Sequence, residues 1–399
     1  MTSAAVVSRL ALLAVLVAAG SADVSHVEFQ LIAFALAASS AVQVIVDPNT
    51  AAAFTVVAWE RCERAGFSVW RGVLRLQLAA AVLTVGALTL IVGAVADSRE
   101  GVLVGMALGT TAMAENVARF ARCSFQRRGQ FASYAAVDAT LGVCRLVGAG
   151  ALLIGGIDVF LALQPLTLLV GLGWVVACSR ALARAGTLPP SPAGVTLRDM
   201  WPFSAGGGVS ALYSQLPTIF VGAVGGLSAG AIYGVATRIT QPSEVLPAAF
   251  SSVRLPELVS APSRQRDALV RTQVRVAATA GALIALVIVA TSPFLAHHLA
   301  RGAQDADVVI ATLALALPFK FVNYQLVAVA VASGNAKARL LAASRVAVVS
   351  ICLTLPAAAL DVRLVPCVVI ACEVFLYAQL RTLQRRIARL PVHSPVVEV

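Results

Sequence analysis

The chain has 399 residues, of which 59% are hydrophobic and only 12% are charged, and its formal net charge is +11. Soluble domains carry about 25% charged residues. The composition therefore excludes a soluble globular protein and predicts an all-α polytopic membrane protein, because long apolar runs recur along its length.

These apolar runs set the number of predicted helices. A helix that spans the membrane needs about 20 mostly apolar residues. We predict about twelve transmembrane helices, near 4–20, 27–46, 72–95, 101–119, 133–155, 158–179, 201–223, 228–250, 272–293, 307–331, 339–360 and 362–381. Twelve spans take up about 240 residues, so no connection between them is long enough to hold a folded soluble domain.

The first predicted helix has a second interpretation. Residues 1–22 combine a basic residue, an apolar core and small residues after it, which is also typical of a cleaved signal peptide. Cleavage would remove one span and leave the orientation of the others unchanged. We favour an uncleaved helix, because an arrangement of two equal halves needs it.

Residues 53–70, between the second and third predicted helices, mix aromatic and basic side chains. Trp59, Phe67 and Trp70 occur next to arginines such as Arg61. Tryptophan and arginine favour the headgroup level of a membrane. The pattern predicts an amphipathic helix that lies in the membrane interface.

The basic residues are concentrated on one side of the predicted membrane. The connections after even-numbered helices and the two termini carry 24 of the 30 Lys and Arg residues, among them Arg119 and Arg122. The positive-inside rule therefore places both termini in the cytoplasm, in a multi-pass protein of the cell membrane. The basic residues therefore reflect the topology of the chain in the membrane. The sequence contains no recognition module of aromatic and basic residues that would indicate a nucleic-acid partner.

A segment rich in proline and glycine divides the predicted helices six and six. We predict an N-terminal six-helix bundle over 1–184, a cytoplasmic linker over 185–200, a C-terminal six-helix bundle over 201–383 and a cytoplasmic tail over 384–399. Six helices return the chain to the cytoplasm, so the two bundles are predicted to be related by an axis along the membrane normal.

The cysteines and histidines do not indicate a metal or redox site. The seven cysteines form no C-x-x-C pair, and the neighbours His297 and His298 have no third ligand at metal spacing. A nucleotide-binding G-x-x-x-x-G-K-[ST] motif is also missing. We therefore predict no metal and no cofactor.

One polar stripe runs along the predicted helix near 228–250. Five of its side chains fall within an arc of about 100°: Tyr233, Thr237, Thr240, Gln241 and Glu244. Arg238 lies beside this arc, and Pro242 is expected to kink the helix. Polar side chains in a membrane helix face protein or water rather than lipid, so the stripe is predicted to face an internal cavity.

Further ionisable residues occur at membrane depth in other predicted helices: Glu115, Asp138, Arg145, Lys320 and Glu373. A charge at the bilayer centre costs at least about 2.5 kcal/mol, so each one needs a partner or an aqueous cavity. The first interpretation is a central cavity in which Arg238, Arg145 and Lys320 attract an anionic substrate, since guanidinium groups suit bidentate contact with phosphate.

The carboxylates Glu115 and Glu244 are then candidate cation or proton sites, and Tyr233 and Gln241 complete the cavity candidates. The second interpretation is that the charges pair internally and lock the bundles, for example Arg145 with Asp138 on one helix face. For Asp138 and Glu373, which lie near predicted helix ends, we expect solvated carboxylates.

Two segments resemble a known family. Residues 207–260 resemble the seventh and eighth helices of flippase-type polysaccharide exporters, in the multidrug/oligosaccharidyl-lipid/polysaccharide superfamily. The motif G-x-x-Y-x-x-A-x-R of this region consists of Gly230, Tyr233, Ala236 and Arg238. Residues 315–340 look like the tenth helix of the same family. The short-looped helices fit the family over essentially the full chain.

The resemblance implies a transporter that flips or exports a polyprenyl-linked oligosaccharide or polysaccharide precursor by alternating access. It implies that Arg238 contacts the pyrophosphate of this anionic, lipid-linked saccharide. Coupling to a Na⁺ or H⁺ gradient stays open. The alternatives are a multidrug or cation antiporter of the same superfamily, an integral membrane enzyme, for which the outer connections are too short, and a non-transporting assembly partner.

Overall fold

The computed structural model describes residues 2–46, 59–127, 130–184, 197–260, 263–333 and 335–389. Within these ranges every regular element is a helix. Eight segments are long and apolar enough to cross a membrane by length and composition alone. The described chain is therefore a multi-pass membrane protein.

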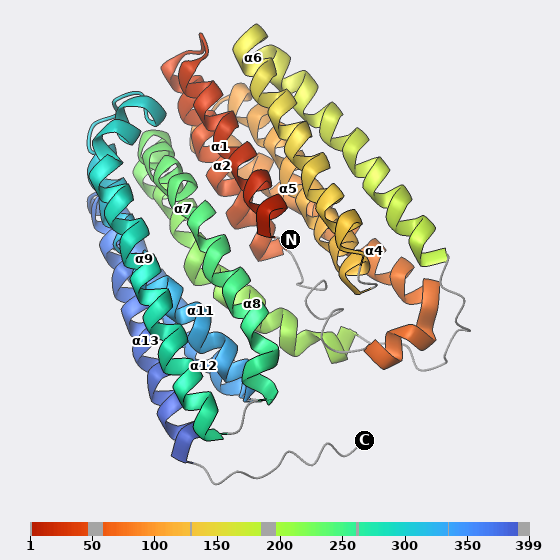
Figure 1. The fold of residues 1–399 in the computed structure, drawn as a ribbon. Helices are drawn as coiled ribbons and strands as arrows, with labels where there is room; N and C mark the ends of the chain where they lie inside the picture. Colours follow the sequence, from red (N-terminus) through yellow and green to blue (C-terminus); the bar gives the residue numbers. More distant parts are fainter. Residues whose placement is uncertain are drawn as a thin grey trace.

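The N-terminal half folds into five labelled helices: α1 (Thr2–Ser21), α2 (His26–Val46), α4 (Trp59–Ala96), α5 (Arg99–Arg127) and α6 (Phe131–Arg184). Gly156 interrupts α6 with φ 66° and ψ −156°, a positive-φ conformation that glycine adopts without steric cost. The chain reverses its direction at this point, so α6 forms two neighbouring rods (Figure 1).

The C-terminal half contains α7 (Leu197–Thr240), η1 (Gln241–Glu244), α8 (Val245–Ser260), α9 (Ser263–Leu299), α10 (Ala306–Ala314), α11 (Leu317–Ala332), α12 (Ala336–Leu360) and α13 (Leu364–Arg389). Gly226 interrupts α7 with φ 81°. The rod after this break continues through η1 into α8, and a short break at 315–316 separates α10 from α11.

These breaks reconcile the labelled helices with the predicted spans. The apolar segment Ala132–Ala177 has 46 residues and Tyr213–Ser251 has 39, about twice what one crossing of the hydrocarbon core needs. Each of these segments therefore crosses twice, while α10 and α11 together cross once. The prediction of about twelve transmembrane helices in two six-helix bundles is confirmed.

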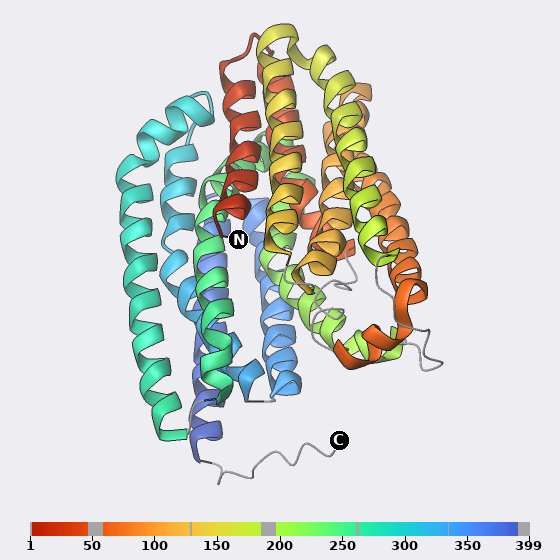
Figure 2. The same ribbon diagram turned by 45° about the vertical axis from the view of Figure 1, so that its right-hand side comes forward.

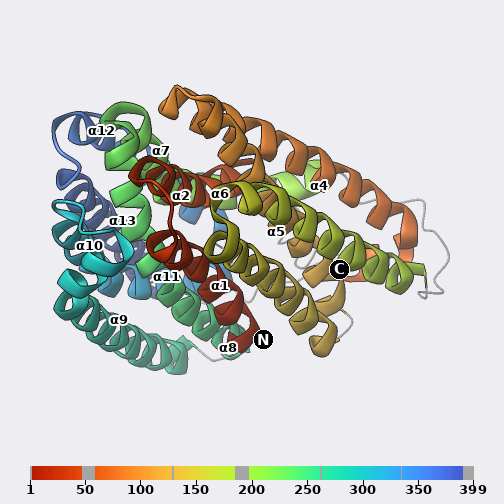
Figure 3. The same cartoon turned by 90° about the horizontal axis from the view of Figure 1, so that it is seen from above.

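The two halves form two lobes. Figure 1 shows the helices of the N-terminal half, in red to yellow, on the right and those of the C-terminal half, in green to blue, on the left. The rotated view in Figure 2 keeps this separation, and in the view from above α4, α5 and α6 form one group while α9 to α13 form another (Figure 3). Helix α2 packs along α7 and so joins the lobes.

The largest apolar core lies where the lobes meet. It includes Phe34 of α2, Val235 of α7 and Ile310 of α10. Phe34 is fully buried against the glycines of α7: a Cβ at Gly222 would lie 2.2 Å from its Cε2 atom, and one at Gly230 would lie 2.7 Å from its Cδ2 atom. Glycine at these positions lets the two helices approach closely.

A polar contact joins the lobes at the end of α1. Arg301, in the turn between α9 and α10, donates hydrogen bonds to four carbonyl oxygens, those of Ala19 (2.9 Å), Gly20 (3.1 Å), Ala22 (2.8 Å) and Val24 (2.7 Å). The last carbonyls of a helix lack partners within the helix and favour a cation. One arginine of the C-terminal lobe therefore caps the first helix of the N-terminal lobe.

Several predicted boundaries differ from those of the structure, and some predicted segments lie outside the described residues. The linker at 185–196 lies outside them, and α7 begins at Leu197, inside the predicted linker. Helix α13 continues to Arg389, past the predicted end of the bundle at 383. Part of the predicted interfacial helix, 53–58, also lies outside the described residues, and the chain is helical from Trp59 onward.

Candidate functional site: a central cavity between the lobes

Two adjoining chambers lie between the lobes. The N-terminal chamber, of about 150 Å³, is lined by Glu115, Arg119, Arg122 and Arg145 among others. The C-terminal chamber, of about 420 Å³, is lined by residues of α7, η1, α11, α12 and α13. Both are lined by Ser40, Gln43, Arg119 and Val245. Because they share these residues, the two chambers form one central cavity.

A cluster of four charges forms one wall of the N-terminal chamber. The Arg122 guanidinium, on α5, donates to Glu115 on the same helix and to Asp138 on α6. The Nη2 atom of Arg145, also on α6, donates to the other Glu115 oxygen at 2.8 Å. Asp138 is fully buried, and Arg145 is 2% exposed. Two cations and two carboxylates are thus linked into one network.

This network bears on two predictions. Asp138 forms an ion pair with Arg122, and Arg145 forms one with Glu115, because α5 continues as a helix to Arg127 and carries Arg122 back to the face of α6. Asp138 was expected to be solvated near a helix end, but it is completely buried. The charges therefore do pair internally, within α5 for Arg122 with Glu115 and between α5 and α6 for the other two pairs.

Arg119 lines both chambers. With its amide oxygen facing the guanidinium, Gln43 of α2 accepts from Nη2 of Arg119 at 3.1 Å and from Nε at 3.2 Å. This two-point contact orients Arg119 at the junction of the chambers. From the sequence, Arg119 and Arg122 are expected in a cytoplasmic connection, because both follow the apolar run of their helix and only tertiary packing turns them inward.

The C-terminal chamber contains an ion pair between two interrupted helices. Lys320 Nζ donates to Glu244 Oε1 at 2.6 Å. Glu244 lies in the 3₁₀ turn η1, and Lys320 lies in the first turn of α11, just after the break at 315–316. Both residues line the chamber. These two sequence candidates therefore meet at the points where both helices are irregular.

Glu373 lies deeper in the same chamber. It is 4% exposed, and its Oε2 accepts from Asn323 Nδ2 at 2.8 Å. The same amide group donates to the backbone oxygen of Glu373 at 3.0 Å. The prediction of a solvated carboxylate near a helix end is wrong, because α13 runs from Leu364 to Arg389 and Glu373 lies well inside it.

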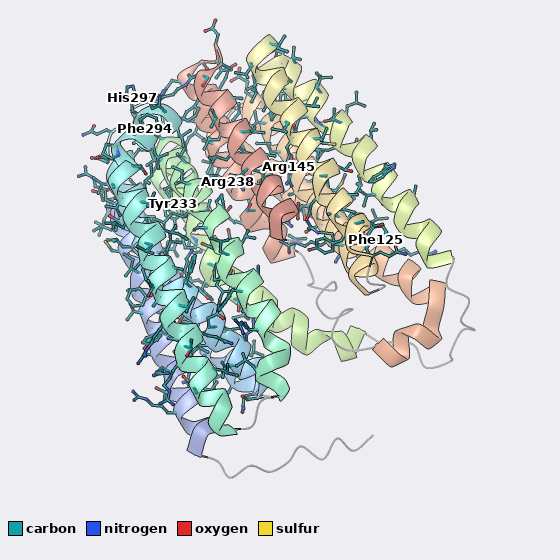
Figure 4. All side chains as sticks on the ribbon, viewed as in Figure 1. Phe125, Arg145, Tyr233, Arg238, Phe294 and His297 are labelled. Carbon is teal, nitrogen blue, oxygen red and sulfur yellow. The ribbon has the colours of Figure 1, made fainter. Side chains whose placement is uncertain are left out.

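Arg238 and Tyr233 lie outside the chamber walls. Arg238 is 3% exposed, and its Nη2 donates to Ser39 of α2 at 3.3 Å. Its Nη1 donates to Gln241 at 3.2 Å, and Gln241 does line the C-terminal chamber. Tyr233 is 2% exposed in the core between the lobes. Figure 4 shows Arg145 on the N-terminal side and Arg238 and Tyr233 on the C-terminal side.

The charges of the cavity walls are unequal. Among the described residues, five cationic side chains and three carboxylates line the two chambers: Arg119, Arg122, Arg145, Lys320 and Arg339 against Glu115, Glu244 and Glu373. An excess of cations in a cleft with low-dielectric walls focuses the electrostatic field and raises the local concentration of anions. Asp138 lies behind this wall and pairs with Arg122, so the net excess is one positive charge, and it lies in the N-terminal chamber.

Comparison with known proteins assigns the fold. No family model and no curated protein matches the sequence. Among solved structures, the inward closed conformation of the lipid II flippase MurJ matches with a TM-score of 0.68 and 14% identity, over 95% of this chain and 86% of that chain. An inward-facing multidrug resistance MATE family transporter of the MOP superfamily matches with a TM-score of 0.67 and 14% identity, over 97% and 95%.

A MOP superfamily transporter from Pyrococcus furiosus matches with a TM-score of 0.64 and 14% identity, over 97% of this chain and 94% of that chain. These proteins are transporters and a flippase rather than enzymes. The chain has the two-lobed, multi-pass fold of this class, and the predicted resemblance to the superfamily is confirmed at the level of the fold.

Proposed function

We propose that the protein is a transporter that moves an anionic, lipid-linked saccharide across the cytoplasmic membrane by alternating access of its two lobes. The observation that carries this proposal is the net cationic cavity between the lobes. Three arginines of the N-terminal lobe, Arg119, Arg122 and Arg145, line its smaller chamber. MurJ, whose fold the chain shares, is named as a lipid II flippase.

The two chambers suit the two parts of such a substrate. Guanidinium groups bind phosphate oxygens in a bidentate manner, and Arg119 is already oriented by Gln43. The larger chamber offers hydroxyl and amide groups that match sugar hydroxyls, among them those of Tyr213, Asn323 and Tyr324. The proposed arrangement is a phosphate group near Arg119 with the saccharide in the C-terminal chamber.

The contacts between the lobes suggest which side is open. The lobes are held together where Arg301 caps the end of α1. Arg119 lies toward the C-terminal end of α5 and Arg339 lies in the first turn of α12, both at the other end of the molecule. Together with the positive-inside rule, this favours a cavity that faces the cytoplasm, with both termini on that side. Arg238 lies at the boundary of the lobes, so a rocking movement would bring it to the cavity wall, where it remains a proposed substrate contact.

A multidrug or cation antiporter is the second candidate. Glu244 and Glu373 line the C-terminal chamber, and carboxylates are the groups that attract a cationic drug or a coupling ion. The inward-facing MATE transporter also matches the fold. This candidate predicts that neutralising the arginines leaves transport intact and that neutralising Glu244 or Glu373 abolishes it, the reverse of the first proposal.

The test is the lipid content of cells that lack the chain. We expect polyprenyl-linked oligosaccharide to accumulate in these cells, wild type to clear it, and Arg119→Gln and Arg145→Gln to leave it in place. Arg271→Gln, on the exposed surface of α9, is the matched control and should clear the lipid like wild type. Immunoblots must show equal amounts of each variant in the membrane.

The outcomes separate the candidates. No accumulation in the deletion strain contradicts the flippase proposal and directs attention to drug or cation export. Accumulation that every cavity variant clears as well as wild type indicates an assembly partner whose cavity is not used for transport.

A further inference from the structure

A separate cavity of about 330 Å³ lies between α12 and α13, and it shares no lining residue with the central cavity. Its floor is formed by small or apolar side chains, among them Leu341, Ala342 and Ala378. Polar groups at its rim come from Arg345, Gln379 and Thr382. The cavity therefore combines an apolar channel with a polar rim.

This cavity opens on the lipid-facing surface of the C-terminal lobe. Leu341 is 52% exposed and Val348 is 62% exposed on α12, and Phe375 is 39% exposed on α13. Large apolar side chains on the outside of a membrane protein contact lipid chains. Arg345 is exposed on the same side of the span Ala338–Leu360. At 1.5 Å per residue it lies about 10 Å inside the end of that span.

Two hydrogen-bond donors at the rim lack acceptors. The described residues supply no hydrogen bond or ion pair to the Arg345 guanidinium. The Nε2 atom of Gln379 is buried and meets no acceptor in the described part of the chain. An arginine at membrane depth and a buried amide donor both carry a free-energy cost unless they are satisfied. No carboxylate lines this cavity among the described residues, so an acceptor has to come from water or from a bound ligand.

We propose that this cavity binds an anionic phospholipid of the surrounding membrane. Its phosphate accepts hydrogen bonds from Arg345 and, once the amide has rotated toward the cavity, from Gln379, and one acyl chain lies along Leu341, Ala342 and Ala378. Arginine extends its apolar stem along the membrane to place its charge on a phosphate. Anionic headgroups contribute an additional attraction to each basic residue near the surface.

The site goes beyond the proposed transport function and does not depend on it. The central cavity is enclosed by both lobes, whereas this cavity uses α12 and α13 alone. Binding can therefore be measured on purified protein without any transport substrate.

The experiment is native mass spectrometry of delipidated, full-length protein titrated with phosphatidylglycerol or with phosphatidylcholine of the same acyl chains. We expect one phosphatidylglycerol to bind about tenfold more tightly than phosphatidylcholine. Arg345→Gln and Gln379→Leu should each remove most of this preference. Ala378→Phe, which fills the channel at an exposed position and keeps both donors, should weaken both lipids.

Arg385→Gln is the matched control, because Arg385 is an exposed arginine near the same end of α13 but does not line the cavity. It should keep the affinity for phosphatidylglycerol within about twofold of wild type. Equal affinity for the two lipids overturns the proposal. An equal loss in Arg385→Gln and Arg345→Gln also overturns it, because it would indicate adsorption of headgroups to any basic surface. If Arg345→Gln does not fold, Ala378→Phe and Gln379→Leu carry the test.

Discussion

At the scale of single residues, Asp138 and Arg122 show what a charge inside the membrane requires. Asp138 is fully buried, and it accepts from Arg122, whose guanidinium also binds Glu115. Removing one partner of a buried ion pair costs about 3–5 kcal/mol, because the other charge stays behind without compensation. Arg122 is therefore expected to stabilise the N-terminal lobe as well as to line its chamber.

We expect Arg122→Gln to lower the thermal unfolding temperature of the detergent-solubilised protein. The double variant Arg122→Gln with Asp138→Asn should recover part of this loss, because the remaining carboxylate of Asp138 is then replaced by a neutral amide. Size-exclusion chromatography of heated samples measures both temperatures. Arg275→Gln, at an exposed position of α9, serves as the control and should stay close to wild type. A loss of the same size in the control would contradict a structural role for the charge cluster.

At the scale of the elements, single glycines turn one labelled helix into two rods. Gly156 has φ 66°, and apart from its neighbours in the chain no atom lies within 4 Å of where its Cβ would be. A side chain there meets only backbone strain, about 1–3 kcal/mol for a residue other than glycine at positive φ with an extended ψ. In the same helix, Gly150 also has open space where a Cβ would lie but keeps ordinary helical geometry.

Gly156→Ala and Gly150→Ala are therefore expected to act in opposite directions. The first should lower the unfolding temperature through strain, and the second should raise it slightly, since alanine is favoured over glycine in a helix by about 1 kcal/mol. Thermal unfolding of the two purified variants measures both effects. If both substitutions stabilise the protein, the positive-φ turn at Gly156 is not part of the folded state.

The interrupted helices of the C-terminal lobe are linked by the ion pair of Lys320 with Glu244. A double-mutant cycle with Lys320→Met and Glu244→Gln tests this link. Each single change should lower the unfolding temperature, and the double change should cost less than the sum, as expected for contacting residues with coupling energies of about 0.5–3 kcal/mol. Additive effects would show that the two side chains do not interact in the solubilised protein.

At the scale of the whole molecule, a few contacts hold the lobes together at one end. Phe34 fits against the glycines of α7, and Arg301 caps the carbonyl end of α1. The ring of Phe29 also lies 5.2 Å from the Arg301 guanidinium carbon. Hydrogen bonds to a charged donor contribute about 1.5–3 kcal/mol each when they are buried. Arg301 is therefore expected to bias the equilibrium between open and closed arrangements of this end.

The distance between two spin labels tests this bias in a background without the native cysteines. One label replaces Asp97 after α4 of the N-terminal lobe, and the other replaces Asp361 after α12 of the C-terminal lobe. Arg301→Gln should increase the population of long distances by about tenfold if the contact contributes a net ~1.4 kcal/mol. Arg275→Gln is the matched control, because Arg275 is an exposed arginine of the C-terminal lobe and lies far from both labelled positions in the chain. Its distance distribution should equal that of wild type. If the distance distributions of Arg301→Gln and of the control are identical, Arg301 does not hold this end of the lobes closed.

The sequence by itself determined the membrane class, the number of spans and their places. Those features depend on local composition, because the thickness of the hydrocarbon core sets the length of every apolar run. It also indicated which polar residues occur at membrane depth, including Glu115, Arg145, Glu244 and Lys320. The periodicity of a single helix carries that information without reference to its neighbours.

Only the tertiary structure decided which of these groups meet. Arg122 reaches Asp138 across two helices, Lys320 reaches Glu244 across two helix breaks, and Arg301 reaches α1 from the other lobe. Arg119 belongs to the cavity although its sequence position is typical of a loop. An ion pair between helices depends on their separation and rotation, and these are set by how the lobes pack. The physical reason is that local patterns specify the face of a helix, whereas the packing of whole helices specifies what lies opposite that face.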